Sequence, residues 1–212
     1  MTNKKHILFL NKVDTLNLST KDLKVSCEPL IKTIPLEPDS HLWNKNIPWI
    51  ITSKTAADLI LCENLPKVMY AIGSKTAQKF PSAIYPTTAT AKALAKLIID
   101  KDEKEVLFVC GEQRRDELPQ LLKKANIKLK EVVVYRTEFL QKNLNLQCID
   151  GLAFMSPSSV ISITQNGGFN NLPCFAIGPT TAQKLIEHGQ EPIVSKKPSA
   201  ESIVQAAKAY FN

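Results

Sequence analysis

The chain repeats one of its own segments. Residues 71–80 read AIGSKTAQKF and residues 176–185 read AIGPTTAQKL, an offset of 105 residues (176 minus 71) with seven of the ten positions identical. A serine follows an apolar run upstream of each copy. The interval is the size of a small domain, which is far longer than the unit of a solenoid. Two copies of one unit predict two similar lobes, and two lobes predict a cleft between them.

Composition and charge narrow the class of protein. No apolar run in the 212 residues approaches the ~18 that a membrane helix needs, and residues 7–10 are too short for a signal peptide. We therefore expect a cytoplasmic protein with no membrane partner. The net charge of +7 fits a soluble surface, nucleic-acid binding or a small polyanionic ligand. Basic residues are dispersed with few aromatics among them, so no nucleic-acid partner is expected.

The cysteines and histidines form no metal or catalytic pattern. The five cysteines are odd in number and lack a C-x-x-C pair, so buried thiols are expected at Cys27, Cys62, Cys110, Cys148 and Cys174. The three histidines, expected to be exposed, are His6, His41 and His188. No acidic cluster suits a metal either. We expect no metal and no cofactor.

Short apolar runs alternate with amphipathic stretches. The predicted strands are 6–10, 48–52, 68–72, 105–110, 132–136, 152–155 and 174–177. The predicted helices are 53–62, 74–80, 89–99, 115–125, 180–188 and 200–210. Residues 105–135 make a complete βαβ unit. This alternation predicts an α/β fold of two similar lobes, each with a parallel sheet flanked by helices.

The lobe boundaries follow from the repeat. The opening strand 6–10 begins a weaker βαβ unit, whose second strand is expected at 29–35 although no clear helix precedes it. The second repeat lacks its own copy of the 105–135 unit. We therefore assign residues 1–33 and 140–212 to a discontinuous lobe 1, and residues 34–139 to an inserted lobe 2. The chain would cross twice through a two-stranded linker, near 33–36 and 137–140.

The best candidate site residues follow strand ends. Ligands of open α/β sheets bind at the carboxyl ends of strands, and helix starts there offer free amides to anions. The candidate substrate-binding residues are Thr52, Ser53, Lys54, Gly73, Ser74, Thr76, Ser156, Pro157, Ser158, Gly178, Pro179, Thr180 and Thr181. Ordinary helix capping explains any one of these turns alone. Their duplication favours a shared ligand.

Two further candidates lie around the clearest βαβ unit. Arg114 and Arg115 open a helix, where cations are electrostatically disfavoured, so an anionic ligand could offset them; a solvated pair is the alternative. Tyr135 ends its strand, either as a half-buried cap or as a phenol that donates a proton. The scarcity of other acid–base groups suggests binding, or chemistry driven by positioning and electrostatics.

Several segments in this order resemble the uroporphyrinogen-III synthase family. The matching segments are ITSK at 51–54, AIG at 71–73 with Thr76 and Ala77, FVCG at 108–111 with Arg115, VYRT at 134–137, FMSPS at 154–158, AIGPTTA at 176–182 and PSAE at 198–201. The resemblance covers nearly the full length. It implies two α/β lobes, a discontinuous first lobe and a two-stranded linker.

The resemblance also implies an activity. A cofactor-free cyclising lyase of porphyrin and heme biosynthesis would act on hydroxymethylbilane, a linear tetrapyrrole with eight carboxylates, and release uroporphyrinogen III. In the family a tyrosine matching Tyr135 is proposed to assist departure of the hydroxyl. Many members carry Thr-Arg-Pro after the first strand, where this chain has Asn11, Lys12 and Val13, so Lys12 is a candidate replacement for that arginine. A monomer is expected. The alternative is a non-catalytic two-lobed binder of a small polyanion.

Overall fold

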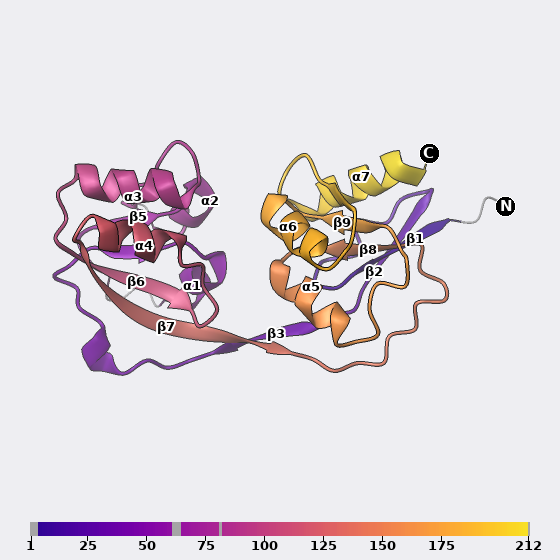
Figure 1. The fold of residues 1–212 in the computed structure, drawn as a ribbon, viewed down its shortest axis with the longest axis horizontal. Coiled ribbons are helices and arrows are strands. Elements are labelled where there is room, and N and C mark those ends of the chain that lie inside the picture. The colour runs from indigo at the N-terminus through magenta and orange to yellow at the C-terminus, as the bar shows by residue number, and fades with distance from the viewer. Residues whose placement is uncertain (1–3, 61–64, 81, 212) are drawn as a thin grey trace. The chain divides into compact units, whose positions relative to one another are not determined.

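The computed structural model describes residues 4–60, 65–80 and 82–211 (Figure 1). The chain divides into two compact units, unit 1 with Met1–Lys32 and Glu138–Asn212, and unit 2 with Thr33–Thr137. Each unit has its own sheet and its own hydrophobic core. The predicted α/β class, with two parallel-dominated sheets flanked by helices, is confirmed.

Unit 1 holds a parallel five-stranded sheet in the order β10-β9-β8-β1-β2. Its strands are β1 (Lys5–Phe9), β2 (Leu23–Cys27), β8 (Gly151–Phe154), β9 (Cys174–Ala176) and β10 (Pro192–Val194). Its helices are α5 (Pro157–Thr164), α6 (Pro179–Glu187) and α7 (Ala200–Phe211). Helices α5 and α6 pack on one face of the sheet and α7 packs on the other (Figure 1). Burial on both faces explains why β8 and β9 are wholly apolar.

Unit 2 holds a sheet in the order β3-β7-β6-β4-β5. Its strands are β3 (Ile31–Pro35), β4 (Trp49–Ile51), β5 (Met69–Ala71), β6 (Glu105–Gly111) and β7 (Lys128–Phe139). Its helices are η1 (Ser40–Leu42), α1 (Lys54–Leu59), α2 (Ser74–Ala77), α3 (Ala91–Asp100) and α4 (Glu117–Lys124). Helices α3 and α4 cover one face, whereas α1 packs on the other. Strands β6 and β7 are parallel and joined by α4, so the predicted βαβ unit is confirmed.

The strand expected at 29–35 is corrected by the structure. The second strand of the opening unit is β2, which pairs with β1 from Lys5 opposite Leu23 to Phe9 opposite Cys27. Because β2 is an edge strand it alternates buried and exposed residues, so a search for continuous apolar runs missed it. Strand β3 instead joins the sheet of unit 2 beside β7. No helix lies between β1 and β2 in the described residues 10–22.

The remaining predicted strands and helices are found with ends that differ by a few residues, and β10, α5 and η1 were missed. The predicted exposure of three single residues was wrong. Cys148 is exposed and Cys27 is half-buried, while Cys110 and Cys174 are buried as predicted and Cys62 lies outside the described residues. His6 is half-buried, because its ring hydrogen-bonds to Ser26 Oγ at 2.7 Å and to the Cys148 carbonyl at 3.1 Å.

Two features are absent from the described residues. None of their helices is long and apolar enough to cross a membrane. No group of three or more His, Cys, Asp or Glu side chains within residues 4–60, 65–80 and 82–211 could hold a metal ion.

Candidate functional site

The first candidate turn joins β4 to α1 in unit 2. Ser53 adopts an extended conformation and caps α1, because its Oγ accepts a hydrogen bond from the Ala56 amide at 3.3 Å. The same oxygen lies 3.0 Å from the hydroxyl of Tyr135, and either group could donate. Thr52 is half-buried and Lys54 is exposed. Ser53 therefore connects a helix start to the phenol.

Tyr135 lies across the end of β6. A Cβ added at Gly111 would lie 2.6 Å from Tyr135 Cε2 and 2.8 Å from its hydroxyl oxygen, so no other residue type leaves room for the ring there. The pairing of β6 with β7 shifts register between Cys110 and Gly111, and the Glu112 amide donates to the Tyr135 carbonyl at 2.9 Å. The irregularity and the glycine together bring the phenol to the carboxyl edge of the sheet.

The two copies of the repeated segment form the same turn. Gly73 follows β5 and Gly178 follows β9, and each is fully extended, with φ and ψ within a few degrees of 180°. The Gly73 carbonyl accepts hydrogen bonds from Thr76 and Ala77 at 3.1 and 3.0 Å. The Gly178 carbonyl accepts from Thr181 and Ala182 at the same distances.

The threonines of these turns are buried but not hydrogen-bonded through their side chains. Thr76 is 6% exposed and Thr181 is 3% exposed. No hydrogen bond joins the Oγ1 of either residue to another described part of the chain. Ser74, Pro179 and Thr180 are exposed beside them. Within the described residues, each turn thus presents a fixed hydroxyl with no protein partner at the carboxyl end of a strand.

The fourth turn joins β8 to α5 in unit 1. Ser156 caps α5 by accepting from the Ser159 amide at 3.3 Å, and Pro157 and Ser158 are half-buried. Asn11, just past β1, donates to Ser156 Oγ at 3.2 Å and accepts from the Met155 amide at 2.9 Å. Sequence reasoning passed over Asn11 and considered only Lys12, which is exposed. The available signal was its place at the end of the strand next to β8.

The two arginines have different surroundings. Arg114 forms ion pairs with Asp116 and with Glu131, the latter at 2.6 Å. The hydrogen bond that it donates to Glu131 is the main reason that the pKa of Arg114 is raised. Its charge is therefore already offset by two carboxylates. Arg115 is exposed, and no ion pair to another described residue involves it.

The predicted residues gather at one edge of each sheet. In unit 2 the turn after β4 and the end of β6 lie beside Tyr135. The turn after β5 lies at the same edge of the sheet, because β6, β4 and β5 are parallel neighbours in that order. In unit 1 the turns after β9, β8 and β1 are likewise adjacent. Cys110 ends in the same region, but burial raises the pKa of its thiol to about 11, so it is no ready nucleophile.

A separate hollow of about 570 Å³ lies in unit 2. Its walls include Trp43, Trp49, Ile60 and Val134. None of the predicted site residues lines it, and it contains no partner for the hydroxyls described above. The candidate site is therefore the edge at the strand ends.

Comparison with known proteins shows the family of the chain. Residues 15–205 match the family described as uroporphyrinogen-III synthase HemD. A uroporphyrinogen-III synthase of Saccharomyces cerevisiae is 30% identical over 200 residues, which cover 79% of this chain and 71% of the yeast protein.

Solved structures share the fold. A uroporphyrinogen-III synthetase from Helicobacter pylori superposes with a TM-score of 0.66 at 23% identity, over 97% of this chain and 99% of that one. A mutant uroporphyrinogen III synthase from the extremely thermophilic bacterium Thermus thermophilus also gives 0.66, at 14% identity over 98% and 97%. With the family match over residues 15–205, the chain belongs to the uroporphyrinogen-III synthase family.

Proposed function

We propose that this chain converts linear hydroxymethylbilane to uroporphyrinogen III, with inversion of ring D and release of one water. The observation that carries the proposal is the phenol of Tyr135, held at the carboxyl edge of the unit 2 sheet by Ser53 and Gly111. Family membership supplies the reaction. The site supplies a hydroxyl donor and several anion-binding turns.

The turns bind the substrate's carboxylates. The repeated Gly73 and Gly178 turns and the Ser53 and Ser156 turns offer hydroxyls or amides at strand ends, and anions favour such positions. The side chains proposed to contact carboxylates are Thr52, Lys54, Ser74, Thr76, Arg115, Ser158, Thr180 and Thr181. Arg114 contributes to substrate binding only indirectly, because its guanidinium already forms ion pairs with Glu131 and Asp116.

Tyr135 assists departure of the substrate hydroxyl. When Ser53 donates its hydrogen to the phenol oxygen, the phenol O–H remains free to donate to the leaving group. The C–O bond breaks, the oxygen leaves as water with the donated proton, and an azafulvene cation remains. Ring D attacks this cation through its substituted α-carbon, which gives a spiro intermediate. The bond from that carbon to the ring C methylene then breaks, the free α-carbon of ring D closes on the released methylene, and the proton lost from that carbon restores the phenol. Holding a flexible chain in one cyclising geometry provides the rest of the acceleration.

The two units are the two lobes of this enzyme in our proposal, and the chain works as a cytoplasmic monomer. The lobes correspond to residues 1–33 with 140–212 and to residues 34–139. The substrate is a small molecule, and neither nucleic acid nor a membrane takes part. No step of the reaction needs a cofactor or a metal.

The deciding experiment is incubation with enzymatically made hydroxymethylbilane, followed by chromatographic separation of the type I and type III isomers. Spontaneous closure yields the type I ring, so a type III product that depends on the protein supports the proposal. A heat-denatured sample is the control. Type I alone, together with measurable binding of the bilane, would instead support a non-catalytic binder of a polyanion.

A further inference from the structure

Two chain segments cross between the units, and both are tied to the same helix of unit 1. The Leu140 amide donates to the Leu30 carbonyl at 2.9 Å, which joins the outgoing and returning segments. Ser162, in α5, donates from its Oγ to the Leu30 carbonyl at 2.7 Å. Asn166, just after α5, donates to the Leu140 carbonyl at 3.0 Å. We call these residues, with Lys142, the crossing anchor.

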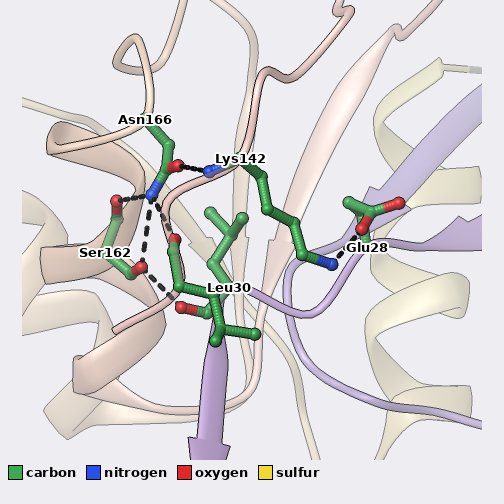
Figure 2. Close-up of polar contacts among 6 residues, drawn as sticks. Glu28, Leu30, Lys142, Ser162 and Asn166 are labelled. Carbon is green, nitrogen blue, oxygen red and sulfur yellow. Dashed lines mark hydrogen bonds and ion pairs between the residues drawn. The ribbon is translucent and has the colours of Figure 1, made fainter. Parts of the chain in front are cut away.

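Both polar atoms of the Asn166 side-chain amide are hydrogen-bonded. Its nitrogen also donates to the Ser162 carbonyl at 2.8 Å, and its oxygen accepts from the Lys142 amide at 2.5 Å, as Figure 2 shows. Asn166 is 8% exposed and Ser162 is fully buried. Removing this side chain would leave the part-buried Leu140 carbonyl and Lys142 amide without this partner, so two hydrogen bonds that hold the returning segment would be lost. The outer pair of Lys142 and Glu28 is half-exposed and contributes little.

The crossing anchor is linked to the proposed substrate turn by two routes. The first is α5 itself, which begins at the Ser156 cap and ends beside Asn166. The second runs through β1, because the Leu30 amide donates to the Leu10 carbonyl at 3.1 Å and the next residue, Asn11, holds Ser156. Leu30 is itself fully buried in the core of unit 1. The contacts form a closed loop, which resists deformation better than a single chain of contacts.

We propose that Asn166 and Ser162 are positioning residues that make the two crossing segments and the Ser156–Ser158 turn move as one rigid body. The consequence for turnover rests on the proposed function, whereas the rigidity itself does not. Neither residue touches substrate in this proposal.

The test compares Asn166→Ala with the matched control Asn145→Ala. Asn145 is an exposed asparagine of the returning segment, and its side chain accepts from the nearby Gln147 amide. Amide hydrogen exchange is followed residue by residue. In Asn166→Ala we expect the Leu140 and Lys142 amides to exchange at least about tenfold faster, with the β8 and β9 amides unchanged. Asn145→Ala should leave all of them unchanged.

Kinetics then separate positioning from binding. With hydroxymethylbilane as substrate, Asn166→Ala should lower kcat about tenfold while KM changes less than about twofold, because the turns themselves remain intact. Ser162→Ala, which removes only one of the two donors to the Leu30 carbonyl, should show about a third of each effect. If Asn166→Ala does not fold, Ser162→Ala alone tests the proposed rigidity.

Unchanged exchange at Leu140 and Lys142 in the folded variants would overturn the proposed rigidity. Faster exchange with wild-type kcat would overturn the link to turnover. If the wild-type protein makes no type III isomer at all, the exchange data still test the anchor on their own, so failure of the proposed function is distinguishable from failure of this inference.

Discussion

The repeated turns of the two units have the same backbone but different surroundings. Gly73 and Gly178 share their conformation and accept the same two hydrogen bonds. A Cβ at Gly73 would lie 2.8 Å from the Cβ of Ala89, whereas one at Gly178 would meet no atom of the described residues within 4 Å. Of the two repeated turns, only the one in unit 2 therefore requires glycine for packing. In unit 1 the open space is available to a ligand.

The two serines that cap helices, Ser53 and Ser156, also have different surroundings. Ser53 and Ser156 each cap a helix that follows a strand inside the sheet, and each also contacts a polar side chain from elsewhere in the same unit. In unit 2 that side chain is the phenol of Tyr135, and in unit 1 it is the amide of Asn11. A phenol can give up a proton and an amide cannot. In the proposed reaction the proton transfer therefore belongs to unit 2, and unit 1 contributes binding.

The largest effect is expected from Gly111→Ala. The new methyl group would overlap the Tyr135 ring, so the phenol must move away from Ser53. We expect turnover to fall about 100-fold and the free energy of unfolding to fall by about 1–3 kcal/mol, as for other overpacked sites. Isomer formation and urea denaturation measure the two effects. Wild-type turnover would show that the ring position does not matter.

Tyr135→Phe should lower kcat about tenfold without abolishing activity, because only the hydroxyl is lost and substrate positioning remains. The matched change in unit 1 is Asn11→Ala, which we expect to alter kcat less than about twofold although it removes the partner of Ser156. Ser53→Ala should add little to Tyr135→Phe in the double variant, since both remove one hydrogen-bonded pair. A wild-type rate in purified Tyr135→Phe would remove the phenol from the mechanism.

Thr76→Ala combined with Thr181→Ala tests whether the two turns bind the same substrate. Each single change should raise KM about threefold, and the double variant should raise it about tenfold, because neither hydroxyl has a hydrogen-bond partner among the described residues to lose. Steady-state kinetics on the bilane measure this. An unchanged Michaelis constant in the double variant would mean that both residues are only parts of a helix start.

Gly178→Ala and Gly73→Ala should give the smallest but cleanest contrast. At Gly178 there is room for the methyl group, so we expect the free energy of unfolding to change by less than about 0.5 kcal/mol while KM rises a few fold. At Gly73 the methyl group meets Ala89, and a loss of about 1 kcal/mol or more is expected. If Gly178→Ala also leaves KM unchanged, the open space is not a ligand contact.

Several features could be predicted from local patterns. The repeated AIG segments predicted two identical turns, and both exist with the same hydrogen bonds. The apolar run before Gly111 and the helical pattern after it predicted the βαβ unit of β6, α4 and β7. Tyr135 was chosen as the residue that ends its strand, but β7 continues to Phe139, and Tyr135 instead lies where β7 passes the end of β6.

Other features depended on residues far apart in the chain. The sequence alone does not decide whether β2 or β3 pairs with β1, because both are short segments with weak patterns of apolar residues. Glu131, on the neighbouring strand β7, pairs with Arg114 and offsets its charge. The two adjacent arginines at 114–115 therefore suggested more unpaired positive charge than the structure has. Asn11 and Asn166 read as ordinary loop residues until their distant partners, Met155 and Leu140, are known.

The sequence alone determined the class of fold, the two strand-end turns and the family, because these depend on periodicity and on short segments in order. The tertiary structure decided which side chains act together. Ser53 reaches Tyr135 across 82 positions, and Ser162 reaches Leu30 across 132. Whether two groups form a hydrogen bond depends on differences of a few tenths of an ångström in the distance between donor and acceptor. Only the packed sheet and its helices set that distance.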